Sequence, residues 1–205
     1  MSLFPAFLKL DGRLAVVVGG GNIAESKIPG LLQAGARVCV VAPYVSAKVR
    51  EWVREYVVEW RAKGFEGEDL VGAFLVVAAT SIRDLNAAVF QEAETRNILC
   101  NAVDDIENCH FYYGSIVQRG DLQIAISTNG KSPALAQRLR KELEGQFGAE
   151  YAAWLEWLGA AREVLRAQSG DAESTKRWLH VLASRPMFER FLKEASGQDG
   201  QQGAA

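Results

Sequence analysis

The sequence is poor in histidine and cysteine, the residues that most often hold zinc. Its 205 residues include two histidines and three cysteines, Cys39, Cys100 and Cys109, with no Cys-x-x-Cys spacing. The absence of a His/Cys cluster with zinc-like spacing argues against a permanently bound metal. Cys39 and Cys100 lie inside apolar, strand-like runs, and we expect them to fill the core. His110 stands alone beside aromatic residues, so we expect it to be structural rather than a metal ligand or a base.

Excess charge and long apolar runs are also absent. The formal net charge is −2, which argues against a nucleic-acid-binding protein or a membrane-surface protein. No apolar run reaches the roughly 18 residues of a membrane span, and the opening MSLFPAFLKLDGR does not resemble a signal peptide. Hydrophobic residues make up 49%, enough to bury a core. We therefore expect a globular protein of the reducing cytoplasm.

Apolar runs alternate with helix-like patterns over the first hundred residues. The spacing predicts strands at residues 14–18, 37–41, 56–60, 73–79 and 98–102, and helices at 22–34, 46–55 and 85–95. Strands separated by helices in this way predict an α/β fold with a parallel sheet and right-handed crossovers.

The pattern changes near residue 105. Residues 111–117 and 122–127, joined by QRGD, predict an antiparallel hairpin. A helix is predicted at 132–145, with Ser132 as N-cap and Pro133 at the first helical position. The chain beyond residue 149 reads as helix, with an aromatic face of Tyr151, Trp154 and Trp157. It predicts helices at 172–183 and 186–195, and then a disordered tail.

Three consecutive glycines stand between the first predicted strand and the first predicted helix. Residues 19–24, GGGNIA, fit the pattern G-x-G-x-x-A of dinucleotide-binding folds. In this pattern Gly19 permits a tight turn, Gly21 lets a pyrophosphate approach the backbone, and Ala24 lets helix and strand pack closely. The backbone N–H groups of Asn22 and Ile23 then face the phosphates. A glycine-rich turn of some other α/β protein is the alternative.

The acidic residue that commonly binds the ribose is missing from this pattern. The second predicted strand ends in Ala42-Pro43-Tyr44, without a carboxylate for the ribose and without an arginine for a 2′-phosphate. We expect backbone groups near Pro43 and Tyr44 to hold the adenosine end, so residue chemistry leaves NAD and NADP both open. Thr80 and Asn101 end successive predicted strands, and we expect them to line the cofactor cleft.

Several stretches together resemble the precorrin-2 dehydrogenase family, also known as the N-terminal dehydrogenase/ferrochelatase part of siroheme synthase. The stretches are LFPAFLKLDGRLAVVVGGGNIAESK, AGARVCVVAP, CNAVDD and IAISTNGKSPALA, and the resemblance covers roughly residues 3–145. It implies NAD-dependent oxidation of precorrin-2 to sirohydrochlorin, followed in some members by insertion of a ferrous ion. Whether iron, cobalt or no metal is inserted stays open. The resemblance also implies a homodimer, which suits the edge-prone hairpin.

The resemblance gives the predicted segments their roles. Residues 1–105 are expected to form an NAD-binding Rossmann domain, and 106–147 a dimerisation and substrate-binding segment. Residues 148–196 are expected to form a helical C-terminal domain, and 197–205 the disordered tail. This sequence departs from the family's pattern after Thr80. The family frequently has aspartate at that position, whereas this chain has Ser81.

Asp104 is the predicted catalytic residue. It matches the aspartate to which the family assigns this role, and it follows the carboxyl end of a predicted parallel strand, where ligands bind in open α/β sheets. A carboxylate there is suited to accept the proton that leaves the macrocycle. The alternative is a loop aspartate that caps a turn. The adjacent Asp105 is also open to this role, but the motif favours Asp104.

A basic segment is the predicted contact for the substrate. Precorrin-2 is a polycarboxylate, and the start of the helix at Ser132, with Lys131 and Arg138, concentrates positive charge on a slightly acidic chain. A capped surface helix with solvated basic residues is the alternative.

Two other functions compete with the dehydrogenase. An NAD(H)-sensing Rossmann module without catalysis is the main one, although the chain shows no basic recognition helix. A chelatase that binds no nucleotide would leave the glycine corner without a purpose.

Overall fold

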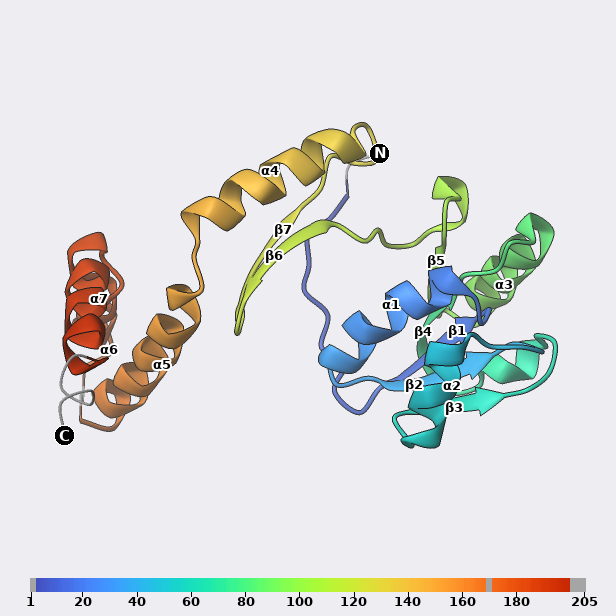
Figure 1. The fold of residues 1–205 in the computed structure, drawn as a ribbon, viewed down its shortest axis with the longest axis horizontal. Helices are drawn as coiled ribbons and strands as arrows, with labels where there is room; N and C mark the ends of the chain where they lie inside the picture. Colours follow the sequence, from blue (N-terminus) through green and yellow to red (C-terminus); the bar gives the residue numbers. More distant parts are fainter. Residues whose placement is uncertain (1–2, 169–170, 200–205) are drawn as a thin grey trace. The chain divides into compact units, whose positions relative to one another are not determined.

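The computed structural model describes residues 3–168 and 171–199, with side chains described as far as residue 195. The chain forms two compact units, Met1–Tyr113 and Gly114–Ala205. Each unit has a sheet of its own, with five strands in the first and two in the second (Figure 1). The predicted division into four segments stays a prediction.

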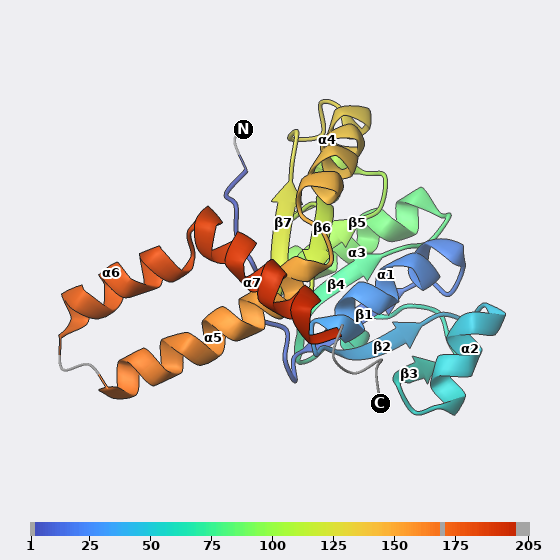
Figure 2. The ribbon, with the colours of Figure 1, turned by 60° about the vertical axis from the view of Figure 1, so that its left-hand side comes forward.

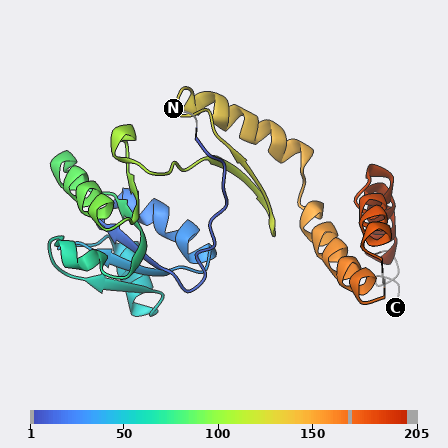
Figure 3. The same ribbon diagram turned by 180° about the vertical axis from the view of Figure 1, so that it is seen from behind.

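The first unit is built on a parallel five-stranded sheet in the order β3-β2-β1-β4-β5. β1 pairs with both β2 and β4, so the strand order reverses between β1 and β4, the position where such sheets bind ligands. Figure 3 shows this sheet from behind. The strands are β1 (Leu14–Val18), β2 (Arg37–Val41), β3 (Val58–Arg61), β4 (Ala73–Ala78) and β5 (Leu99–Ala102).

Helices cover both faces of this sheet, which explains the uninterrupted apolar strands. Successive strand residues point to opposite faces, so Val17 joins a core cluster with Ile28 while Val16 joins another with Val89. The helices are α1 (Asn22–Gln33), α2 (Ala47–Arg54) and α3 (Arg83–Thr95), with 3₁₀ turns η1 (Gly67–Leu70) and η2 (Ile106–Asn108). The predicted α/β class with a parallel sheet is confirmed.

Two predicted strands begin too early. β3 starts at Val58 instead of residue 56, because Tyr56 has φ 58° and its N–H bonds the Val53 carbonyl, which places it in the turn that ends α2. The hairpin starts at Ser115 instead of residue 111. The Asn101 side chain donates to the Phe111 carbonyl at 2.8 Å, and this bond holds the segment before the hairpin against β5 within the first unit.

The second unit consists of a hairpin followed by helices. β6 (Ser115–Arg119) and β7 (Leu122–Ile126) are antiparallel, and α4 (Pro133–Gln146), α5 (Glu150–Gln168), α6 (Ala172–Leu182) and α7 (Arg185–Asp199) follow. The Ser132 hydroxyl accepts the Leu135 N–H at 3.2 Å, so the predicted N-cap of α4 is confirmed. None of the helices in the described residues is long and apolar enough to cross a membrane.

The predicted aromatic face of α5 packs on α7. The ring centroids of Tyr151 and Trp154 lie 4.5 and 4.7 Å from that of Phe188, and those of Trp157 and Phe191 lie 6.1 Å apart. α7 extends to Asp199, so the part of the predicted tail from residue 200 onward lies outside the described residues.

Candidate functional site

The three glycines after β1 have different surroundings. Gly19 has φ +115°, and a Cβ there would lie 2.5 Å from the Ala79 carbonyl oxygen. A Cβ on Gly20 would lie 2.3 Å from the Tyr44 carbonyl oxygen, whereas one on Gly21 would meet nothing within 4 Å. The first two glycines thus let the chain pass close to the segments that follow β4 and β2. The third leaves open space at the start of α1.

The N-terminus of α1 offers free hydrogen-bond donors at this open space. Gly21 is the N-cap and provides no side-chain bond, and the backbone bonds of the helix begin with Glu25 N–H to the Gly21 carbonyl at 3.0 Å. The N–H groups of Asn22 and Ile23 precede that bond, so they lack acceptors within the helix. Together with the helix dipole they favour an anion. The corner therefore fits the pyrophosphate of a dinucleotide.

The loop after β2 lies beside the glycine corner. The Ser46 N–H donates to the Gly20 carbonyl at 2.7 Å, and the Ser46 hydroxyl donates to Glu25 of α1 at 2.7 Å. Pro43 and Tyr44 are exposed within this loop, and Tyr44 retains 84% of its accessible surface. The structure thus brings the predicted adenosine-binding residues next to the predicted phosphate-binding residues.

Thr80 and Asn101 lie at the carboxyl ends of β4 and β5, and both side chains serve the fold. The Thr80 hydroxyl donates to the Asn86 side-chain oxygen at 2.7 Å, which ties the loop to α3. The Asn101 amide is buried and donates to the Phe111 carbonyl. A contact of either residue with the cofactor stays a prediction, and the amide nitrogen of Asn101 is already engaged.

Asp104 follows β5 with an exposed side chain and φ 61°. Backbone bonds hold the turn around it, from Val103 N–H to the Ala78 carbonyl and from Asp105 N–H to the Ala102 carbonyl. No hydrogen bond or ion pair of the described residues uses the Asp104 carboxylate. The left-handed backbone is one that Asp and Asn tolerate better than most residues. This arrangement presents a free carboxylate at the carboxyl edge of the sheet.

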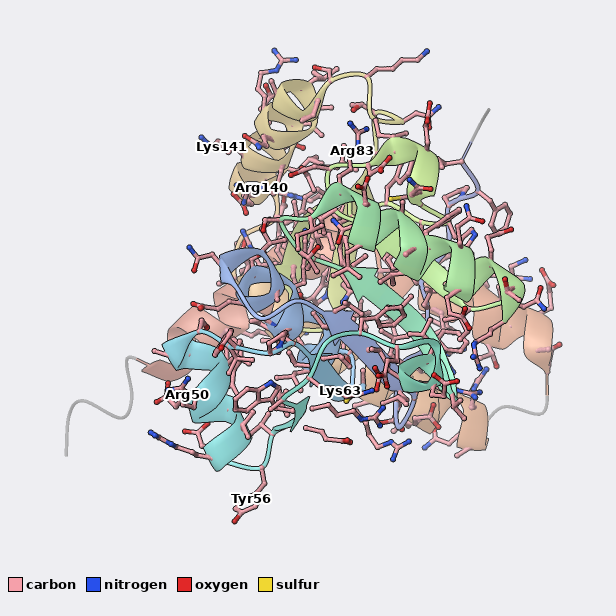
Figure 4. All side chains as sticks on the ribbon, turned by 90° about the vertical axis from the view of Figure 1, so that its right-hand side faces the viewer. Arg50, Tyr56, Lys63, Arg83, Arg140 and Lys141 are labelled. Atoms are coloured by element: carbon pink, nitrogen blue, oxygen red, sulfur yellow. The ribbon has the colours of Figure 1, made fainter. Side chains whose placement is uncertain are left out.

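The neighbouring Asp105 has a structural role. Its side chain is 9% exposed and accepts a hydrogen bond from the Asn108 side-chain amide at 2.8 Å. The Arg83 guanidinium lies 3.8 Å from the same carboxylate, and Arg83 itself, labelled in Figure 4, is 84% exposed. Sequence reasoning missed Arg83, although a basic residue that opens a helix after a parallel strand lies close to the ligand-binding edge of the sheet.

The expected structural residues are confirmed in their places. Cys39 and Cys100 are fully buried, and burial raises the pKa of their thiols to about 11 and about 12. Both ring nitrogens of His110 are engaged, Nδ1 with the Cys100 N–H at 3.0 Å and Nε2 with the Glu94 carboxylate at 2.6 Å.

The predicted substrate residues lie in the second unit, at the start of α4. Ser132 caps the helix, and Lys131 is exposed without an ion pair among the described residues. Arg138 is exposed and lies 3.5 Å from Glu142 one turn further along the helix. Arg140 and Lys141, labelled in Figure 4, extend the basic character of α4. Of the two charged contacts predicted here, Arg138 has a carboxylate neighbour, and Lys131 has none among the described residues.

Comparison with known proteins agrees with these features. An NAD(P)-binding family model matches residues 6–115, and a model for the central part of sirohaem biosynthesis proteins matches residues 119–146. Siroheme synthase 3 of Aeromonas hydrophila is 38% identical over 202 residues, which are 98% of this chain and 43% of that protein. Siroheme synthase of Mannheimia succiniciproducens is 38% identical over 94% of this chain and 40% of its own length.

A solved structure resembles the whole fold. The structure of SirC, a precorrin-2 dehydrogenase, matches with a TM-score of 0.77 and 29% identity, over 95% of this chain and 100% of that one. The resemblance inferred from the motifs is confirmed. The chain spans about two fifths of the length of the siroheme synthases that it matches.

Proposed function

Because the chain belongs to the NAD(P)-binding family whose model matches residues 6–115, we propose that it oxidises precorrin-2 to sirohydrochlorin with NAD. The observation that carries this proposal is an open glycine corner and the carboxylate of Asp104, which no described residue engages, both at the carboxyl edge of one parallel sheet. The likeness to siroheme synthases and to SirC, a precorrin-2 dehydrogenase, supports the same assignment.

The reaction removes one hydride and one proton from the macrocycle. NAD, when bound, supplies the acceptor for the hydride. Asp104 takes the proton, and its exposure leaves the carboxylate accessible for this step. The left-handed turn holds the carboxylate at the sheet edge without a competing hydrogen bond in the described residues. The same carboxylate is suited to receive pyrrole protons if a ferrous or cobaltous ion enters sirohydrochlorin, which is the proposed second activity.

NAD is the proposed cofactor in preference to NADP. Residues 42–47, APYVSA, contain no arginine or lysine to pair with a 2′-phosphate. The next basic residue, Lys48, is already paired with Glu51 at 2.6 Å. The open space at Gly21 and the free N–H groups of Asn22 and Ile23 serve the pyrophosphate that both cofactors share.

The substrate is proposed to bind through its carboxylates to Lys131, Ser132 and Arg138. Lys131 supplies an ammonium group that pairs with no carboxylate of the described residues, and the capped start of α4 adds the favourable end of the helix dipole. A reducing cytoplasm is the proposed location, which suits three cysteines that form no disulfide.

A homodimer is the proposed assembly. β6 and β7 form a two-stranded sheet whose outer edges pair with no strand of the described residues. An open strand edge favours pairing with another chain.

One assay tests the activity. The purified protein is given precorrin-2 with NAD or NADP, and absorbance is followed before and after addition of ferrous or cobaltous ion. We expect oxidation with NAD, and a fall of about 10²–10⁴-fold in Asp104→Asn with NAD binding retained. Glu107→Gln is the matched control, because Glu107 is an exposed carboxylate of the same loop. Near-normal turnover in Asp104→Asn would contradict the mechanism, and a wild-type protein without NAD-dependent oxidation would contradict the function.

A further inference from the structure

The second unit contains a cavity that the proposed oxidation does not use. It lies between α5 and α6 and has a volume of about 850 Å³, within the usual range for small-molecule sites of about 300–1,000 Å³. Leu155 and Leu158 of α5 and Leu179 of α6 provide an apolar lining. Figure 2 shows the two helices as the arms of a helical hairpin. The cavity is therefore suited to a ligand with an apolar body.

Positive charge surrounds this apolar lining. Arg162 and Arg166 reach the cavity from α5, and Lys176 and His180 reach it from α6, while no aspartate or glutamate lines it among the residues described. Arg162, Arg166 and Lys176 also belong to no ion pair in residues 3–168 and 171–195. Arg185 and Arg190, two other exposed arginines of the second unit, do have carboxylate partners, whereas Arg177 belongs to no ion pair of the described residues. The cavity thus complements an anion in charge.

The spacing of these cations is unfavourable without a partner. Arg162 and Arg166 are four residues apart on one helix, where like charges repel and destabilise the helix. Lys176 adds a third positive charge from the facing helix. A bound anion with several carboxylates would reduce this repulsion, because each cation would gain an opposite charge.

A glycine keeps the cavity open. Gly159 lines the cavity in the interior of α5, and a Cβ built on it would meet nothing within 4 Å. No close backbone approach requires glycine at this position, and alanine would favour the helix. The helix therefore lacks a side chain at the point where one would project into open space.

We propose that this cavity binds an amphipathic polycarboxylate, namely a tetrapyrrole whose ring packs on the leucines and whose edge carboxylates pair with Arg162, Arg166 and Lys176. The apolar lining and the unpaired cations call for an apolar, anionic ligand. The choice of a tetrapyrrole within that class rests on the proposed function, whose substrate and product are both polycarboxylate tetrapyrroles. The cavity would then hold a tetrapyrrole apart from the proposed contacts on α4.

The test uses uroporphyrin, a stable octacarboxylate porphyrin, and follows its fluorescence during titration with the full chain. All variants are made in a Lys131→Glu background, so that the proposed contacts at α4 do not mask the cavity. The cavity pair, a double variant with Arg162→Glu and Lys176→Glu, should bind uroporphyrin roughly tenfold or more weakly. The matched control is the pair Arg177→Glu and Lys193→Glu, which changes the charge equally at exposed residues outside the cavity. The control should change affinity by no more than about threefold.

Gly159→Leu provides a second, uncharged variant. It places a side chain inside the cavity while it keeps a good helix former in α5, so we expect weaker uroporphyrin binding with unchanged helical content by circular dichroism. Should the charge-reversed pair lose folded structure, Arg162→Gln with Lys176→Gln is measured in its place. Equal loss of binding in the cavity pair and the control pair would overturn the proposal. So would wild-type affinity in Gly159→Leu.

Two parallel measurements separate this proposal from its alternatives. If the cavity variants change the oligomeric mass by light scattering while uroporphyrin binding persists, the cavity is an interface between copies and the proposal fails. NAD-dependent oxidation of precorrin-2 is measured in the otherwise unaltered chain. If the otherwise unaltered chain oxidises precorrin-2 and the cavity variants bind uroporphyrin as tightly as before, the cavity site is refuted and the proposed function is not. Cavity-dependent binding without any oxidation would support the site and refute the proposed function.

Discussion

Two adjacent glycines of the dinucleotide corner should respond to substitution in opposite ways. A Cβ on Gly20 would lie 2.3 Å from the Tyr44 carbonyl oxygen and 2.8 Å from a methyl group of Val45. That loop has little freedom to move away, because the Ser46 N–H is bonded to the Gly20 carbonyl at 2.7 Å. Overpacking of this kind destabilises a fold by about 1–3 kcal/mol. We expect Gly20→Ala to lower Tm by about 2–12 °C.

Gly21→Asp should leave the fold intact and abolish cofactor binding. Gly21 has φ −89° and open space around it, so an aspartate fits without strain, and aspartate is a good N-cap residue. A carboxylate about 4 Å from a pyrophosphate charge is repelled by about 4 kcal/mol at an effective dielectric constant near 20. That energy lowers the affinity for NAD by at least about 100-fold.

Calorimetric titration with NAD and thermal melting test both expectations. Gly30→Asp is the matched control, because Gly30 also faces open space on α1 but lies away from its N-terminus. It should bind NAD within about threefold of the wild-type affinity, since the added charge is distant and screened. A folded Gly21→Asp protein with unchanged NAD affinity would refute the assignment of the corner. A Gly20→Ala protein as stable as the wild type would refute the steric argument.

Two further predictions concern stability. Burial raises the pKa of Asp69, but bonds from the Glu66 N–H, Lys63 and Arg61 outweigh it and hold that pKa below its ordinary value of 3.8. Ionised Asp69 therefore stabilises the fold above about pH 4, and this stabilisation is lost as the pH falls through the lowered pKa. In urea unfolding at neutral and acid pH, the free energy of unfolding of Asp69→Asn should fall less on acidification than that of the wild type. Tyr56 has φ 58° and is 96% exposed, pointing away from the protein in Figure 4. Tyr56→Gly should raise the free energy of unfolding by up to about 1 kcal/mol, and a lower Tm would contradict this.

The sheet could be predicted from the sequence because its strands are buried on both faces. Runs such as Val16 to Val18 have to be covered on two sides, and helices placed between the runs provide the cover. The start of α4 could also be predicted, because serine favours the N-cap position and proline favours the first helical position, where Ser132 and Pro133 stand. Local chemistry decided these elements, so the pattern alone was sufficient.

Long-range contacts decided what the sequence could not predict. The hairpin begins late because Asn101, ten residues away, bonds the Phe111 carbonyl. The difference between Asp104 and Asp105 depends on the turn, which exposes the first carboxylate and directs the second toward Asn108. The α5–α6 cavity arises only when two helices meet, so neither helical pattern reveals it. Each of these features depends on residues distant in sequence or on the geometry of a turn.

The hairpin of the second unit leads to the last prediction, which concerns the proposed dimer. Ile116 is 47% exposed and lies opposite Ala125 across the two strands, while Val117 on the other face is buried. On this face Ile116 and Ala125 lie beside Gln118 and Gln123, and the described residues leave about half of the Ile116 side chain uncovered. Burial of an isoleucine side chain stabilises an interface by about 1.5–3 kcal/mol, and a two-fold symmetric dimer buries each such residue twice.

We therefore expect Ile116→Asp to weaken dimerisation by at least about 100-fold, because about 3 kcal/mol of apolar burial is lost and two carboxylates lose their water. Sedimentation velocity across micromolar concentrations measures the change. Val71→Asp is the matched control, since Val71 is an exposed valine of the first unit, 64% accessible and outside the hairpin. Its dimer should be as stable as that of the wild type. An Ile116→Asp protein that stays dimeric at the same concentrations would show that this face of the hairpin is not the interface. A wild-type chain that is monomeric throughout would refute the dimer itself.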